Sequence, residues 1–185
     1  MAAQTLVQAQ FVLRLALGLI FLGSALAKLR DPAAFVRGVL EYRVLPRPLA
    51  RVYGQFLPYA ELGTALLLLS GFFLAVAAAL VVLMLVSFAM AIAANARRGR
   101  AVACHCFGEG SASQVGWHTL VRDLVLLLPG CWLLWAATRT IPMVPLAAVD
   151  LVPAIGIAVL LALSYALFVE SLELVVGADR RIALH

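Results

Sequence analysis

The sequence predicts an all-α fold, a polytopic membrane helical bundle of four to five transmembrane helices. The chain has 185 residues, of which 65% are hydrophobic and only 12% are charged, whereas soluble domains are about 45–50% apolar and about 25% charged. A soluble protein of this length could not bury so much apolar surface, because small domains have little interior for their area. We therefore expect residues 1–185 to form a single membrane domain, with the lipid bilayer as its first partner.

Five apolar stretches are candidates for membrane crossings. Their lengths are close to the ~20 residues that a helix needs to cross the hydrocarbon core, and they cover residues 11–29, 55–70, 72–96, 118–137 and 151–169. No charged residue occurs from Leu62 to Ala96, which as one helix would be ~50 Å long. We therefore expect a hairpin with its turn near Ser70-Gly71. Pro153 and Gly156 interrupt the last stretch, so the expected number of spans is four to five.

A short interfacial helix is expected between the first two spans, over residues 32–42. Asp31 and Pro32 form a typical helix start, with the aspartate as the cap and the proline at the first helical position. Apolar side chains then recur at helical spacing with charged residues between them, the pattern of a helix that lies in the membrane surface. We expect Pro46 and Pro48 to end this helix.

Basic residues gather on one side of the predicted bundle. With five spans, two of the fourteen Lys and Arg residues, Arg14 and Arg139, fall on one side, and twelve fall on the other: Lys28, Arg30, Arg37, Arg43, Arg47, Arg51, Arg97, Arg98, Arg100, Arg122, Arg180 and Arg181. The positive-inside rule places the twelve in the cytoplasm, so the N-terminus is expected outside. The formal net charge is +5. We nevertheless expect no nucleic-acid partner, because the sequence shows no basic groove or set of stacking aromatics.

Cys104 and Cys106 form the clearest chemical signal in the sequence. They lie one residue apart in the polar Cys loop over residues 97–117, which the charge count places on the cytoplasmic side. Neighbouring arginines favour the thiolate, which is the reactive form. A disulfide across one residue is strained, and strained disulfides are the labile, catalytic kind. Cys104, His105 and Cys106 are therefore the candidate catalytic residues of a redox site.

Two other interpretations of this loop remain open. Soft thiolates suit Cu(I) or zinc, so Cys104, His105 and Cys106 could hold a metal, although the second ligand pair of a closed zinc site is missing and we expect no metal. The loop could also be inert. Cys131 lies in the middle of an apolar span, and we expect it to be a small buried hydrophobic residue.

Ionisable residues inside the predicted spans form a second candidate site. Charged groups within a membrane are costly and by default indicate function. Glu61, Lys28, Arg122 and Asp123 are all expected near the cytoplasmic ends of their spans, either as a structural pair of Glu61 with Lys28 or Arg122, or as a proton relay or the polar lining for a quinone headgroup. Arg14 is expected at the opposite face, in contact with the interface or lipid phosphates.

Four segments of the chain occur in the order found in a known family. They are LRLALGLIFLGSALAKLRDPAAF at Leu13–Phe35, EYRVLP at Glu41–Pro46, LPYAELG at Leu57–Gly63 and CHCFG at Cys104–Gly108. On these residues the chain resembles the MauE/DoxX family of small bacterial redox-associated membrane proteins. It departs from the MauE-like pattern at His105, where a glycine usually stands between the cysteines.

The resemblance implies a bundle of four or five spans in the bacterial cytoplasmic (inner) membrane, with a role in thiol–disulfide chemistry. MauE-like proteins are tied to the maturation of methylamine dehydrogenase, whose small subunit is rich in disulfides. DoxX-like relatives are linked to quinone-coupled sulfur oxidation and to thiol stress complexes. By position, the resemblance makes Cys104 and Cys106 the redox pair and makes Arg14, Lys28 and Glu61 framework or quinone-site residues.

The sequence thus predicts a membrane thiol–disulfide oxidoreductase. Its Cys-x-Cys pair would exchange with a thiol-containing or thioredoxin-like partner and pass electrons to or from a quinone, the one cofactor implied. Two alternatives are a non-enzymatic assembly or maturation factor that docks through residues 30–55 and a Cu(I)-handling protein that uses Cys104, His105 and Cys106.

Overall fold

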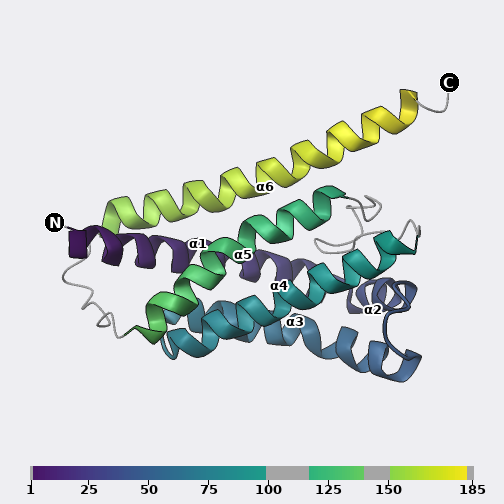
Figure 1. Ribbon diagram of the computed structural model, residues 1–185, viewed down its shortest axis with the longest axis horizontal. Helices are drawn as coiled ribbons and strands as arrows, with labels where there is room; N and C mark the ends of the chain where they lie inside the picture. Colours follow the sequence, from purple (N-terminus) through teal and green to yellow (C-terminus); the bar gives the residue numbers. More distant parts are fainter. Residues whose placement is uncertain (1, 99–116, 140–150, 183–185) are drawn as a thin grey trace.

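All the secondary structure in the described residues is α-helical, which confirms the predicted fold class. The computed structural model describes residues 2–98, 117–139 and 151–182. The helices are α1 (Ala2–Arg30), α2 (Pro32–Glu41), α3 (Arg47–Ser70), α4 (Leu74–Arg97), α5 (Trp117–Thr138) and α6 (Leu151–Ile182). The five long helices run roughly side by side in an elongated bundle, and the short α2 lies at one end (Figure 1).

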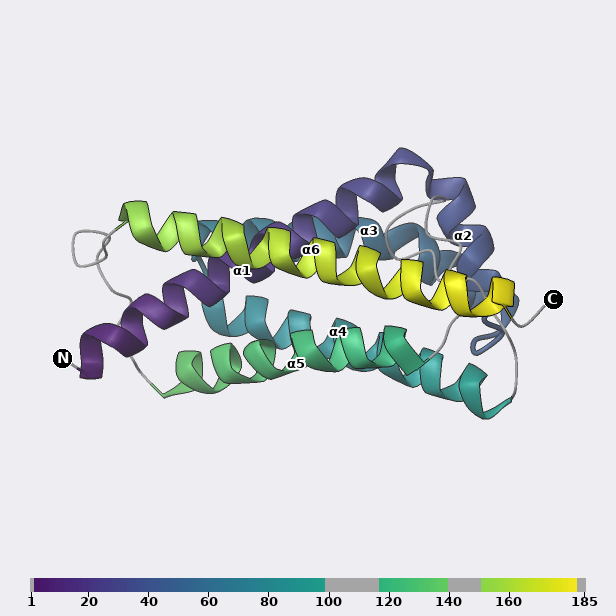
Figure 2. The ribbon, with the colours of Figure 1, turned by 90° about the horizontal axis from the view of Figure 1, so that it is seen from above.

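Helix α1 is the centre of the bundle. It packs against α3, α6 and α5, while α4 pairs with α5 and contacts α3. Seen from above, α6 crosses over α1, and α4 and α5 lie together along one side (Figure 2). Successive long helices run in opposite directions, so the end of α1, the start of α3, the end of α4 and the start of α5 all meet at the end that carries α2. We call this the α2 end, and the opposite one the turn end.

Four of the described helices are long and apolar enough to cross a membrane, over Leu6–Arg30, Leu74–Arg97, Leu120–Thr138 and Leu151–Val169. The protein is therefore a multi-pass membrane protein. Helix α3 has 24 residues but is less apolar, with Arg47, Arg51 and Glu61 in it. It nevertheless lies along α1 for much of its length (Figure 1).

The core is built from apolar side chains of all six described helices and from small residues where helices approach closely. Leu17, Leu68, Val81 and Leu133 are all at most 2% exposed. A Cβ added at Gly18 would come within 2.9 Å of the Leu69 side chain, so the α1–α3 crossing depends on a residue without a side chain. Small residues serve the same purpose in other membrane bundles.

The predicted hairpin turn is present at the turn end. Gly71 caps α3 with a φ of 79°, and its N–H donates to the carbonyl oxygen of Leu67 at 2.9 Å. This left-handed conformation is open to glycine at little cost. Phe73 then begins the next helix with a φ of 49°, and α4 returns towards the α2 end.

The connection between α1 and α3 differs in part from the prediction. Asp31 caps α2 as expected, since its Oδ1 accepts from the N–H of Ala34 at 2.8 Å. The prediction that Pro46 and Pro48 end α2 is wrong, because α2 ends at Glu41 and Pro46 is instead the N-cap residue of α3. Proline fits the first turn of a helix, where the N–H it lacks would have no partner. Helix α3 therefore begins eight residues before the expected residue 55.

Candidate functional site

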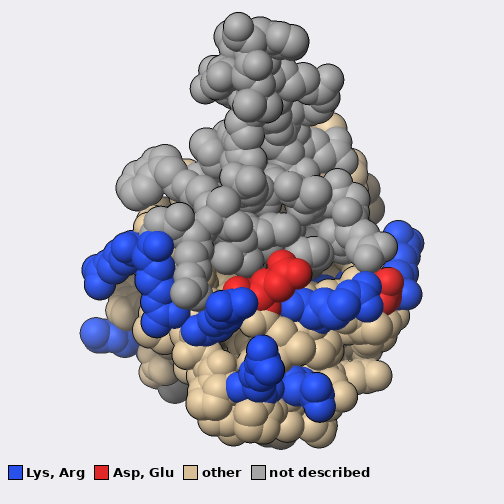
Figure 3. Space-filling model, turned by 90° about the vertical axis from the view of Figure 1, so that its right-hand side faces the viewer, with Lys and Arg blue, Asp and Glu red and all other residues tan. Residues whose placement is uncertain are grey.

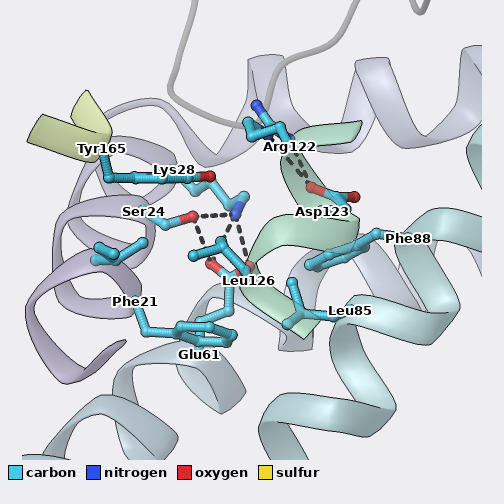
Figure 4. Close-up of a pocket in the computed structure, with 11 residues that line it drawn as sticks. Phe21, Ser24, Lys28, Glu61, Leu85, Phe88, Arg122, Asp123, Leu126 and Tyr165 are labelled. Carbon is cyan, nitrogen blue, oxygen red and sulfur yellow. Dashed lines mark hydrogen bonds and ion pairs between the residues drawn. The ribbon is translucent and has the colours of Figure 1, made fainter. Parts of the chain in front are cut away.

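A buried ion pair joins α1 and α3 near the α2 end. The Lys28 ammonium lies 2.6 Å from Oε1 and 2.7 Å from Oε2 of Glu61. The Oγ of Ser24, one turn earlier in α1, accepts from the same ammonium at 2.7 Å. Lys28 and Glu61 are 3% and 1% exposed. Three oxygen atoms thus match the three hydrogens of the ammonium, and the dashed lines in Figure 4 mark these contacts.

A second ion pair faces the same small pocket from α5. Arg122 donates to Oδ1 of Asp123 from Nη2 at 3.1 Å and from Nε at 3.3 Å, and both residues are buried. Tyr165 reaches the pocket from α6 (Figure 4). We call Ser24, Lys28, Glu61, Arg122, Asp123 and Tyr165 the polar cluster. The pocket that they line holds about 30 Å³, which is room for one or two water molecules.

The polar cluster has no net formal charge. It contains two cations and two carboxylates, and each cation contacts a carboxylate within 3.1 Å. A buried charge without a partner would cost several kcal/mol, so pairing explains how the bundle accommodates these residues. The sequence left open whether Glu61 pairs with Lys28 or with Arg122; the partner is Lys28.

A much larger cavity, which we call the α2 cavity, lies between α2, α3 and α4. Its volume is about 520 Å³, and its lining is almost wholly apolar, with Lys28, Tyr42, Tyr53 and Ser87 as the polar exceptions. The hydroxyl groups of Tyr53 and Ser87 lie 3.0 Å apart. Lys28 and Phe88 line both this cavity and the small pocket of the polar cluster. The sequence carries no local signal of the α2 cavity, because a cavity depends on how three helices pack.

Arg14 lies apart from the polar cluster, at the turn end. Its guanidinium is 4.8 Å from the centroid of the Phe11 ring and lies against Gly71, where an added Cβ would overlap its Nη1. An arginine here can extend its charged head to the membrane interface. The structure therefore separates Arg14 from the other candidate residues.

Comparison with known proteins identifies the family. A family model described as "Methylamine utilisation protein MauE" matches residues 6–136 of this chain. The chain belongs to the MauE family. The MauE part of the predicted resemblance is thus confirmed, and the relation to DoxX proteins stays a prediction. The matched region contains α1–α5 with Lys28, Glu61, Arg122 and Asp123, whereas Tyr165 of α6 lies beyond it.

Relatives of this MauE-family chain come from several bacteria. It is 38% identical to the methylamine utilization protein MauE of Paracoccus denitrificans over 117 residues, which are 63% of each protein. It is 34% identical to the protein of the same name from Methylorubrum extorquens over 122 residues, again 63% of each. The alignments therefore span slightly less than two thirds of these relatives. No solved structure matches the chain.

The exposed basic residues of this MauE-family protein lie mainly at the α2 end. Arg30, Arg37, Arg43, Arg47, Arg51, Arg97 and Arg98 are all exposed there, and blue side chains surround much of the described part of that face (Figure 3). The Nη1 of Arg98 donates to the carbonyl oxygen of Arg43 at 3.1 Å, linking α4 to the α2–α3 connection. In the described part of the turn end, the only basic residues are Arg14 and Arg139.

Cys104, His105 and Cys106 lie outside the described residues. Of the predicted Cys loop over residues 97–117, the structure describes Arg97, Arg98 and Trp117, which belong to helix ends at the α2 end. Among the described residues, no group of three His, Cys, Asp or Glu side chains could hold a metal ion.

The expectation that Cys131 is buried is wrong. Cys131 is a free, exposed thiol on α5, whereas its neighbour Gly130 is buried and packs towards Val81 of α4. Cys131 therefore occupies the outward side of the helix, which in a membrane faces lipid. A membrane helix is apolar on all sides, so hydrophobicity alone does not reveal which side faces the core.

Proposed function

We propose that this protein is a thiol–disulfide redox protein of the bacterial cytoplasmic membrane that supports the maturation of a partner protein. Cys104 and Cys106 would be the exchanging pair, and His105 between them would favour the thiolate when protonated. The observation that carries the proposal is the gathering of buried, paired ionisable groups at the end of the bundle from which the cysteine segment leaves α4. The names of the relatives, methylamine utilization protein MauE, support maturation of methylamine dehydrogenase as the setting.

The proposed chemistry transfers two electrons. A thiolate of the partner attacks the Cys104–Cys106 disulfide, and a second partner thiol resolves the mixed disulfide, so the partner is oxidised and the pair is reduced. A membrane quinone takes up the two electrons and two protons released when Cys104 and Cys106 form their disulfide again, and becomes the quinol. Glu61 and Arg122 of the polar cluster would assist proton movement.

The proposed orientation follows from charge. The α2 end carries most of the basic residues, and such residues are retained in the cytoplasm. The cysteine segment would then lie on the cytoplasmic side and the N-terminus outside. An impermeant maleimide applied to intact cells and to inverted vesicles tests this, in a Cys131→Ser background. We expect labelling of Cys104 and Cys106 in inverted vesicles only; labelling in intact cells would reverse the orientation.

The functional test uses Cys104→Ser, Cys106→Ser and the matched control Cys131→Ser. The purified protein in proteoliposomes is given decylubiquinone and reduced thioredoxin, and the loss of thiols is followed. We expect either of the first two substitutions to lower the rate by at least tenfold, because each removes one half of the exchanging pair, and Cys131→Ser to leave it unchanged. Unchanged rates in both loop variants would refute the redox proposal.

A second candidate function is a non-enzymatic assembly factor. The exposed arginines of α2, of the connection that follows and of the start of α3 favour it, because they present positive charge to a partner at one face. In that case the cysteine variants would still support maturation in cells. Charge reversal with Arg43→Glu and Arg47→Glu would instead abolish co-purification of the partner.

A further inference from the structure

The α2 cavity is too large to be a packing defect. Protein interiors leave few voids larger than a water molecule, whereas this cavity measures about 520 Å³, within the range of about 300–1,000 Å³ that holds small molecules. Its lining includes Val44, Leu45 and Met90, which are 40%, 42% and 62% exposed. These apolar side chains form a rim, so the cavity opens on the surface of the bundle.

The walls suit a flat ring that carries oxygen atoms. Phe35, Tyr42, Tyr53 and Phe88 contribute four aromatic rings, and aromatic rings stack on flat ligands. The Ser87 hydroxyl donates to the carbonyl oxygen of Met84 at 2.7 Å, so in the 3.0 Å contact between the two hydroxyls the proton comes from Tyr53. A ligand oxygen near this pair could accept from the Tyr53 hydroxyl by replacing Ser87 as its acceptor.

The charge on the walls favours an uncharged ligand. Among the described lining residues, Lys28 is the only charged one, and Glu61 neutralises it at 2.6 Å. The carboxylate of a fatty acid or the phosphate of a phospholipid would therefore meet no unmatched positive charge in the cavity. An uncharged molecule loses little by entering it.

We propose that the α2 cavity binds a membrane quinone. The ring would lie among the four aromatic side chains with an oxygen at the Tyr53 and Ser87 hydroxyls, and the isoprenoid tail would leave over Val44, Leu45 and Met90 into the lipid. What the quinone does there, taking electrons from the thiol pair, rests on the proposed function. Lys28 of the polar cluster also lines this cavity, so the groups proposed to move protons lie close to the ring that takes the protons up.

The experiment maps the site directly. The full-length protein in lipid nanodiscs is illuminated with a photoreactive azido-quinone, and the cross-linked residues are identified by mass spectrometry. We expect cross-links within residues 35–57 and 87–92, and competition by decylubiquinone. Cross-links confined to α5 and α6, or equal competition by decanol or palmitate, would overturn the proposal, because the cavity would then hold nothing or any alkyl chain.

Two substitutions in the cavity test the geometry. Ala91→Phe fills the cavity from α4 and should weaken decylubiquinone binding at least tenfold, whereas Ala79→Phe on an exposed side of the same helix should change it less than twofold. Tyr53→Phe keeps the ring and removes the hydroxyl, and should weaken binding about threefold to tenfold, the effect of one hydrogen bond. Wild-type binding by both Ala91→Phe and Tyr53→Phe would overturn the proposal, whatever their stability.

The same measurement separates this inference from the proposed function. The double variant Cys104→Ser/Cys106→Ser should bind decylubiquinone like the wild type, because it leaves every described lining residue of the cavity unchanged. If it binds but the single cysteine variants still oxidise thiols, the redox proposal fails and the quinone site stands. If the thiol oxidation depends on both cysteines but no quinone binds in the α2 cavity, this inference alone fails.

Discussion

The Lys28–Glu61 pair shows how single residues place charge inside an apolar bundle. Each group is almost completely buried, and the pair lies where α1 and α3 pack against each other. The two charges cancel, and Ser24 supplies the third acceptor for the ammonium. Removing one partner would leave an uncompensated charge, whereas removing both would leave an apolar contact.

We therefore expect Lys28→Met to lower the free energy of unfolding by about 3–5 kcal/mol. The double variant Lys28→Met/Glu61→Leu should recover most of that loss, because neither partner is left as an uncompensated buried charge. Unfolding in mixed detergent micelles, followed by circular dichroism, measures both. Glu41→Gln, at an exposed position of α2, is the control and should stay within about 0.5 kcal/mol of the wild type. The single variant Glu61→Leu completes the comparison. If the double variant lost as much free energy of unfolding as the two single variants together, the ion pair would be contradicted.

A second residue-scale prediction concerns Gly71. Its φ of 79° is unfavourable for any residue with a Cβ, and an added Cβ would also overlap the Arg14 guanidinium. Gly71→Ala should therefore destabilise the protein by at least about 1–2 kcal/mol. Gly63→Ala is the matched control, since nothing lies within 4 Å of its added Cβ and α3 should gain about 0.5–1 kcal/mol of helix propensity. The same detergent unfolding assay ranks the two variants, and equal stability would argue against this turn geometry.

At the residue scale, the important side chains could be predicted from the sequence, but their partners could not. Glu61 and Lys28 stand out because ionisable residues inside apolar spans are rare. The choice of Lys28 over Arg122 as the partner of Glu61 depends on how each helix is rotated about its axis, which composition does not reveal. Ser24 could have been found, because it lies four residues before Lys28 and therefore on the same side of α1. The hydroxyl pair of Tyr53 and Ser87 joins two helices and had no such signal.

Among the helices, α2 is the one whose start is specified most clearly by neighbouring residues. Asp31 accepts the N–H of Ala34, and α2 then covers the α2 cavity through Phe35, Gly38 and Val39. Asp31→Ala should cost this helix about 1 kcal/mol, the usual value of an N-cap. Tryptic cleavage after the exposed Arg37, quantified by mass spectrometry, should become about fivefold faster. Asp31→Asn keeps an oxygen acceptor and should behave like the wild type; equal cleavage of all three proteins would show that the cap does not stabilise α2.

The elements also show where hydropathy stops being informative. Apolar runs predicted the long helices because a bilayer requires such runs, but the helices continue outside them: α6 extends to Ile182, beyond its apolar part that ends at Val169. In water or at the interface a polar sequence can still be helical. The prolines at 46 and 48 were interpreted as a helix end because proline blocks a helix interior. In the structure they begin α3, where the same missing N–H does no harm.

At the scale of the whole molecule, the position of α3 decides the topology. Its polar residues keep it out of the four helices that qualify as spans by composition, yet it lies along α1 between the α2 end and the turn end. The buried Lys28 compensates Glu61, the charge that makes α3 unfavourable as an isolated span. We therefore expect α3 to cross the membrane as part of the bundle, which makes five crossings in total.

Single cysteines in a cysteine-free background test this crossing. Arg47→Cys and Phe73→Cys flank α3, and Arg98→Cys and Thr138→Cys serve as references for the α2 end and the turn end because they flank connections outside α3. An impermeant maleimide added to intact cells should label the cysteines at 73 and 138, because both reach water outside. Those at 47 and 98 should react only after the membrane is permeabilised. If the cysteine at 73 instead reacts together with that at 47 while the one at 98 reacts from the opposite side, α3 returns to the side it came from, and the bundle has four crossings.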